Sequence, residues 1–152
     1  MVARILIATL PLVALMATAC DGTTEPTNGD VRIAIQQALT GQTTSAGTFV
    51  ISGFVADSGQ TAEELTFGGP LTQSPVPVTF RRTLTGHNGT MVITGSATLS
   101  FTSQTNATLA GSWVVSSATG TYTGGSGTLS GSANFGTTPP TATITYAGVL
   151  RR

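Results

Sequence analysis

The chain has 152 residues, with six arginines and no lysine against six acidic side chains, and 8% of its residues are charged while 39% are hydrophobic. An average soluble domain carries about 25% charged residues, so this chain is unusually neutral. A net charge of zero offers no basic surface for nucleic acid, and the hydrophobic fraction excludes a disordered chain. We therefore expect one folded domain and no nucleic-acid partner.

The N-terminus has the layout of a secretory signal peptide. Arg4 precedes an uncharged apolar run, ILIATLPLVALM, and three small residues then lead to Cys20, the one cysteine of the chain. We predict that residues 1–19 are cleaved. The segment resembles a bacterial lipoprotein signal, which implies a lipid on Cys20, anchoring to a membrane and an extracytoplasmic place in the bacterial cell envelope.

Two other interpretations of this segment stay open. It is either a plain secretory signal with an incidental cysteine or an uncleaved anchor, although residues 5–19 are shorter than the roughly 20 residues of a membrane-spanning helix. After Cys20 the sequence DGTTEPTNGD has no apolar residue. We expect residues 20–30 to form a flexible tether and residues 31–152 to form the folded domain.

Alternation of apolar and polar residues runs through the whole domain and predicts β-strands. A helix competes for the first segment, but a period of two favours a strand there as well. We expect turns at Asp57 to Gly59 and at Asn88-Gly89, where a tight hairpin would require positive φ at both residues. The predicted strands cover residues 31–39, 49–55, 63–67, 76–85, 90–101, 108–116, 128–135 and 142–150.

About eight strands with short connections predict an all-β, antiparallel fold. Its simplest form is a closed eight-stranded barrel, and a β-sandwich is the alternative. Closure would also protect long, threonine-rich strands that have few charges along an edge. Most apolar rows contain a glycine or alanine, and these small residues either bend the strands or leave room for a cavity. We favour bending, with larger neighbours such as Trp113 and Tyr146 filling the interior.

Three stretches rich in glycine, threonine and serine carry a family resemblance. They are GTFVISGFVADSG at residues 47–59, RTLTGHNGTMVI at 82–93 and GSWVVSSATGTYTGGSGTLSGSANF at 111–135. Together they resemble bacterial secreted proteins whose pattern is similar to the eight-stranded barrels of the allene oxide cyclase and dirigent-like families. The resemblance implies the fold. No position matches the catalytic residues of either family, so it implies no chemistry.

The reactive side chains are few. His87 lies in a Gly-His-Asn-Gly turn, where we expect a solvated side chain rather than a catalytic base. The scattered carboxylates and single histidine predict no metal site, and no motif predicts a cofactor. We assign no catalytic residue from the sequence.

Strand parity singles out three charged residues as candidates for the lining of an internal cavity. Arg82 shares its side of a strand with apolar residues, as do Asp57 and Glu63. Inside a barrel these charges would have to pair, and Arg82 with Asp57 or Glu63 would place a polar spot in an apolar pocket. Each could instead lie at a strand end with its charge in solvent. Trp113 and Tyr146 complete the candidate lining.

Four functions compete at this stage. The first is a non-catalytic envelope module that binds a small apolar ligand or a partner. The second is a cyclase or isomerase that folds an apolar substrate in the cavity. The third is a structural or adhesive surface protein, and the fourth is an outer-membrane barrel, for which the nine aromatic residues are few.

Overall fold

The computed structural model describes residues 27–152. The predicted signal peptide, Cys20 and most of the predicted tether lie outside these residues. Among the residues described, no helix has the length and apolar character needed to cross a membrane.

Every element of the fold is a β-strand, which confirms the all-β prediction. The strands are long. They are β1 (Asn28–Leu39), β2 (Thr44–Gly53), β3 (Asp57–Phe67), β4 (Val76–Gly86), β5 (Thr90–Phe101), β6 (Asn106–Ala118), β7 (Gly124–Asn134) and β8 (Thr141–Arg151). Six of them contain the whole segment predicted from alternation; β2 and β7 end one or two residues before their predicted segments do.

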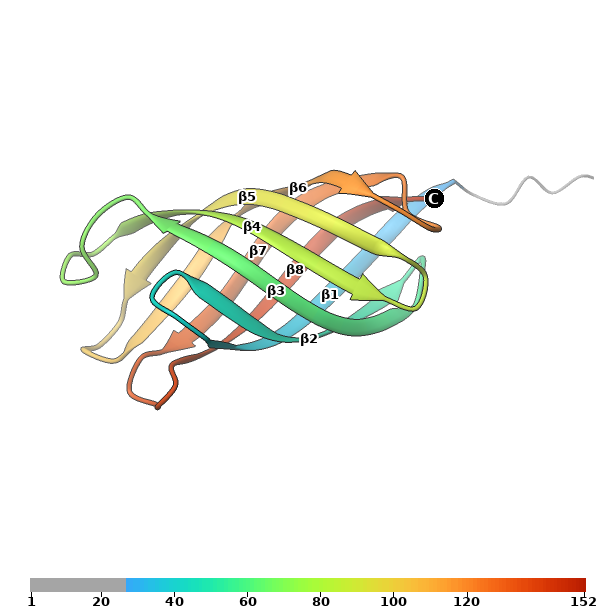
Figure 1. Cartoon of the computed structure of the whole chain (residues 1–152). Helices are drawn as coiled ribbons and strands as arrows, with labels where there is room; N and C mark the ends of the chain where they lie inside the picture. The colour runs from blue at the N-terminus through green and yellow to red at the C-terminus, as the bar shows by residue number, and fades with distance from the viewer. Residues whose placement is uncertain (1–26) are drawn as a thin grey trace, which may run out of the picture.

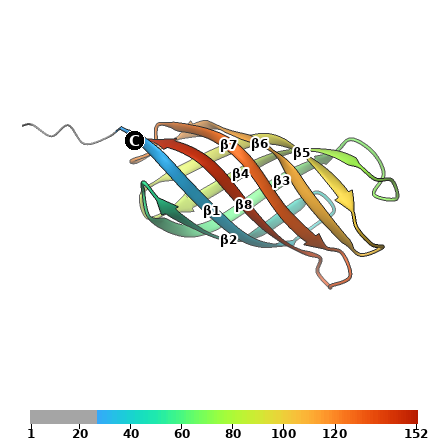
Figure 2. The ribbon, with the colours of Figure 1, turned by 180° about the vertical axis from the view of Figure 1, so that it is seen from behind.

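The eight strands form one closed antiparallel barrel in sequence order, so the barrel prediction is confirmed and the sandwich alternative is wrong. β8 returns to pair with β1 along eleven residue pairs, from Asn28 opposite Arg151 to Ala38 opposite Thr141. Figures 1 and 2 show the strands wrapping around one axis from opposite sides. Since every strand has two neighbours, no edge is left to pair with another chain.

The two ends of the barrel differ in which connections they carry. The β1–β2, β3–β4, β5–β6 and β7–β8 connections lie at one end, which we call the mouth. The chain enters β1 and leaves β8 at the other end, which we call the base (Figure 1). The β2–β3, β4–β5 and β6–β7 connections also lie at the base.

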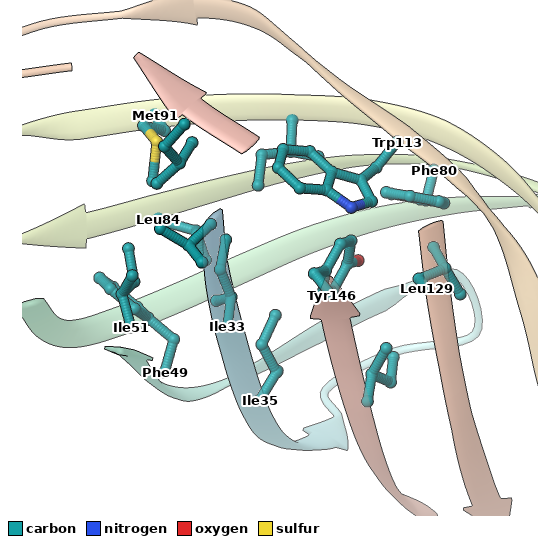
Figure 3. Close-up of a cluster of buried hydrophobic side chains, with 14 of the residues drawn as sticks. Ile33, Ile35, Phe49, Ile51, Phe80, Leu84, Met91, Trp113, Leu129 and Tyr146 are labelled. Atoms are coloured by element: carbon teal, nitrogen blue, oxygen red, sulfur yellow. The ribbon is translucent and has the colours of Figure 1, made fainter. Parts of the chain in front are cut away.

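Apolar side chains of all eight strands point into the barrel, as the alternation predicts. Hydroxyl-bearing residues such as Thr79, Thr98 and Thr128 alternate with them and are exposed. Eight strands enclose a space that side chains can fill, and Figure 3 shows the central ones pointing toward one another. Most of the buried core forms one cluster, and a smaller one of Val76, Val78, Leu99 and Ala107 lies toward the mouth.

The glycines of the inward rows allow adjacent strands and aromatic rings to come close. A Cβ atom on Gly127 would lie 2.0 Å from the Ala147 carbonyl oxygen, and one on Gly95 would lie 2.6 Å from the Phe80 ring. Trp113 packs inward from the strand between them, and its Nε1 donates to the carbonyls of Thr128 (3.0 Å) and Ala147 (3.3 Å). The glycines therefore allow the strands to coil tightly around the barrel, and aromatic rings fill the space that the missing side chains leave.

Two predicted turns differ from the structure. Asp57 to Gly59 begin β3 rather than forming a turn, because Asp57 already pairs with Ile51 of β2. At the β4–β5 turn only Gly89 has positive φ, 141°, so Asn88 does not take the conformation that the hairpin prediction required. Hydrogen bonds to β3 and to the segment before it hold this turn instead. The side chain of Asn88 donates to the Ala56 carbonyl at 2.9 Å.

Candidate functional site

Arg82 is the largest fully buried side chain of the barrel. It follows Phe80 in the inward row of β4, and its exposed fraction is 0%. The β3–β4 register places Glu63 directly opposite. An isolated charge at this depth would be strongly destabilising, so the surrounding oxygens decide whether the site is compatible with folding.

Each nitrogen of the Arg82 guanidinium has an oxygen partner. Nη2 forms an ion pair with Glu63 Oε1 at 2.5 Å. Nη1 donates to Thr61 Oγ1 at 3.0 Å, and Nε donates to the Tyr146 hydroxyl, also at 3.0 Å. The charge is thus neutralised and hydrogen-bonded from β3 and from β8.

The second oxygen of Glu63 faces two further donors. Gln37 Nε2 of β1 donates to Oε2 at 2.8 Å, and Ser45 Oγ of β2 donates to it at 2.9 Å. Five of the eight strands therefore contribute to one polar cluster inside an apolar barrel. We call it the buried polar cluster; it consists of Gln37, Ser45, Thr61, Glu63, Arg82 and Tyr146.

Tyr146 joins this cluster to the aromatic core. Its ring meets those of Phe80 and Trp113 edge to face, with centroids 6.1 and 5.9 Å apart. Burial raises the pKa of the Tyr146 hydroxyl to about 12; the Arg82 charge lowers this pKa, and the Glu63 charge raises it by a smaller amount. The hydroxyl is therefore protonated near neutral pH and accepts a hydrogen bond from Arg82.

A cavity of about 60 Å³ lies on the mouth side of the buried polar cluster. Its wall is almost entirely apolar and comes from all strands except β2. Its polar lining residues are Gln37, Glu63, Thr141 and Tyr146, whereas Arg82 and Trp113 do not line it. The apolar lining includes Leu39, Leu65, Phe67, Val78, Phe80, Ala97, Leu99, Leu109, Leu129, Ala133, Phe135, Pro140, Ala142 and Ile144.

The outer part of this cavity leaves apolar surface incompletely covered. Leu39, Phe67, Leu109, Phe135 and Pro140 all belong to the lining and are only half-buried. The more central members, such as Phe80 and Ile144, are buried. The cavity is thus a shallow apolar cup whose inner end is polar.

Asp57 lies at the base, away from the cavity. Its carboxylate accepts hydrogen bonds from the amides of Ser58 (2.8 Å), His87 (2.9 Å) and Asn88 (3.2 Å) and from the Tyr122 hydroxyl (2.5 Å). Burial alone would raise the pKa of Asp57, but these four donors together hold it below its ordinary value. Asp57 therefore fastens the β4–β5 turn and the β6–β7 loop to the start of β3.

The structure brings Arg82 and Glu63 together and leaves Asp57 apart from both. Glu63 and Tyr146 line the cavity, while Arg82 and Trp113 lie behind its wall. The side chain of His87 is 83% exposed, as expected of a turn residue.

Four polar residues of these networks escaped the sequence analysis as site residues. Gln37 belongs to an apolar row, and Thr61 is on the same side of its strand as Glu63. The alternation of residues therefore indicated that both side chains point inward. Ser45 precedes the row of the second strand, and Tyr122 lies in a loop without periodicity. No pattern in the sequence marks these last two.

Comparisons with known proteins found no matching family model, no matching curated protein and no matching solved structure. The resemblance to the allene oxide cyclase and dirigent-like barrels stays a prediction. Within residues 27–152, no group of three or more histidine, cysteine or carboxylate side chains is placed to hold a metal ion.

Proposed function

We propose that this protein is a non-catalytic, lipid-anchored module of the bacterial cell envelope that binds a small apolar ligand at the mouth of its barrel. The observation that carries the proposal is the apolar cup, whose outer side chains are half-buried around a cavity. Covering apolar surface of this kind is favourable by about 25 cal/mol per Å².

The size of the cavity defines the kind of ligand. A pocket that encloses a drug-sized molecule measures about 300–1,000 Å³. The cavity here, at about 60 Å³, takes only a narrow group such as the end of an alkyl chain or the edge of a ring. The remainder of the ligand would lie against Leu39, Phe67 and Phe135 at the mouth.

The polar groups beside the cavity support binding over catalysis. Both carboxylate oxygens of Glu63 are already engaged, one by Arg82 and the other by Gln37 and Ser45. The pKa of Tyr146, about 12, is far from the pH at which a general base would work. The cluster is therefore suited to hold a fixed polar surface rather than to exchange protons.

Fluorescence of N-phenyl-1-naphthylamine, an apolar dye that brightens when it leaves water, tests the proposal on the purified full chain. We expect saturable binding that Ala142→Phe weakens by about tenfold or more, because the phenyl group fills the cavity. Ala147→Phe is the matched control, since Ala147 is on the same strand and faces outward. If the dye does not bind, or if both folded variants bind it equally, the barrel is a structural or adhesive protein instead.

A further inference from the structure

We propose that the cup selects ligands whose leading end is a hydrogen-bond donor, a hydroxyl or an amino group, over ligands that lead with a carboxylate. This inference rests on the proposed function and names the chemical class of the ligand. It depends on the polar inner end of the cavity, where Glu63 and Gln37 present acceptor oxygens and the hydroxyl of Tyr146 is a donor beside them.

Gln37 supplies the first observation. Its Nε2 donates to Glu63, and because a carboxylate only accepts hydrogen bonds, the orientation of the amide is fixed. Its Oε1 is consequently directed away from Glu63, and this buried atom has no hydrogen-bond partner in the part of the chain that the structure describes. Buried acceptors nearly always accept a hydrogen bond, so we infer that a donor from a bound ligand would complete the hydrogen bonding of this atom.

The cavity provides the place for that donor. Gln37 lines it, and the terminal torsion of a glutamine side chain is soft, so a rotation that gives up the hydrogen bond from Nε2 to Glu63 can turn Oε1 toward the cavity. Glu63 keeps its other partners during this rotation, because Ser45 still donates to Oε2 and Arg82 still pairs with Oε1. The rotation therefore leaves the buried charge pair intact.

The distribution of charge sets the preference against anions. Glu63 lines the cavity, but its counter-charge on Arg82 is fully buried behind the wall. A ligand carboxylate would face the negative charge of Glu63 and the oxygen of Gln37, and the Tyr146 hydroxyl would be its one donor among these groups. A hydroxyl or ammonium group would donate to Gln37 Oε1, and an ammonium group would also be attracted by Glu63.

Four probes of similar length test this inference on the purified full chain: 1-octanol, octylamine, octanoate and octyl methyl ether, each measured by displacement of N-phenyl-1-naphthylamine. We expect octanol and octylamine to bind about tenfold more tightly than the ether, which lacks a donor, and octanoate to bind most weakly. This ranking is measured on the unaltered protein and does not depend on a variant.

Gln37→Met identifies the residue responsible. Methionine has a similar shape and no amide oxygen, so we expect the preference for octanol over the ether to disappear while the ether binds as before. Gln36→Met is the matched control, because Gln36 is the next residue of β1 and is exposed on the outer face. It should keep the preference.

The outcomes separate this inference from the proposed function. If all four probes bind with equal affinity, or if octanoate binds best, donor selection is wrong and the apolar site stands. If the dye and all four probes fail to bind, the proposed function itself is wrong. A preference for octanol that persists in folded Gln37→Met would also overturn the inference, because the donor would then bind elsewhere.

Discussion

Arg82 shows how a single buried charge is made compatible with an apolar barrel. Its Nε and Nη1 donate to Tyr146 and Thr61, and its Nη2 forms the ion pair with Glu63, although Nη2 makes no hydrogen bond in the part of the chain that the structure describes. Removing one member of such a pair costs more than the pair contributes, because the remaining charge stays buried. The cluster therefore ties five strands to one another through side chains as well as through the backbone.

Glu63→Gln tests this dependence. We expect it to lower the free energy of unfolding by about 3–5 kcal/mol, since Arg82 would keep its charge without a counter-charge. Urea unfolding followed by circular dichroism measures the change. Glu64→Gln is the matched control: Glu64 is the next residue of β3, exposed and opposite Arg81, and its loss should cost less than about 1 kcal/mol. Equal losses in the two variants would contradict a structural role for the buried pair.

Asp57 makes the stability of the base dependent on pH. Its folded pKa lies below the ordinary value of 3.8 because Tyr122 and three backbone amides donate to the carboxylate. A lowered folded pKa means that the stabilisation is complete above pH 3.8 and is lost as the pH falls through the folded pKa.

We expect Asp57→Asn to be less stable than the unaltered protein by a constant amount between pH 5 and pH 8. That difference should shrink below about pH 4, where the carboxylate of the unaltered protein becomes protonated. Thermal unfolding at a series of pH values measures it. Asp30→Asn, an exposed change in β1, is the control. A difference of the same size at pH 3 and pH 7 would show that the four hydrogen bonds do not depend on the charge.

At the scale of the strands, the alternation of residues was sufficient to predict the elements and their inward rows. Arg82 and Glu63 could be predicted to point inward because they share rows with Phe80 and Leu65. Their pairing could not be predicted, since it depends on the register of β3 against β4, which the connection of residues 68–75 sets. The alternation along a strand predicts on which side of the sheet a residue lies. Only the register between adjacent strands determines which residue lies opposite it.

The β5–β6 pair shows a second limit of periodicity. A bulge lies where Val92 pairs with Ser117 but the adjacent Ile93 pairs with Val115, so Ser116 is the extra residue. Its Oγ donates to the Val92 carbonyl at 3.0 Å. The insertion shifts the parity of β6, so that Ala118 packs on the core although an uninterrupted count from Trp113 places it outside. Nothing in the sequence marks a bulge of this kind.

For the whole molecule, the two ends of the barrel have different roles. The base is where the chain enters β1 (Figure 1) and where the Tyr122 hydroxyl donates to Asp57, whereas the residues that line the cavity lie toward the mouth. If Cys20 carries the lipid, as the sequence predicts, the tether joins the barrel at its base. The mouth is then the end of the barrel that lies farther from the point of attachment.

Replacing the predicted lipid attachment site tests this arrangement. We expect Cys20→Ser to move the protein from the membrane fraction to the aqueous fraction, because two or more acyl chains on one residue provide stable anchoring. Immunoblotting of fractions separated by ultracentrifugation measures the change, and Thr23→Ser, which keeps the cysteine, should stay with the membranes. The released barrel should still bind N-phenyl-1-naphthylamine, because the cavity is built from residues 37–146. A Cys20→Ser protein that remains membrane-bound would show that another part of the chain holds it there.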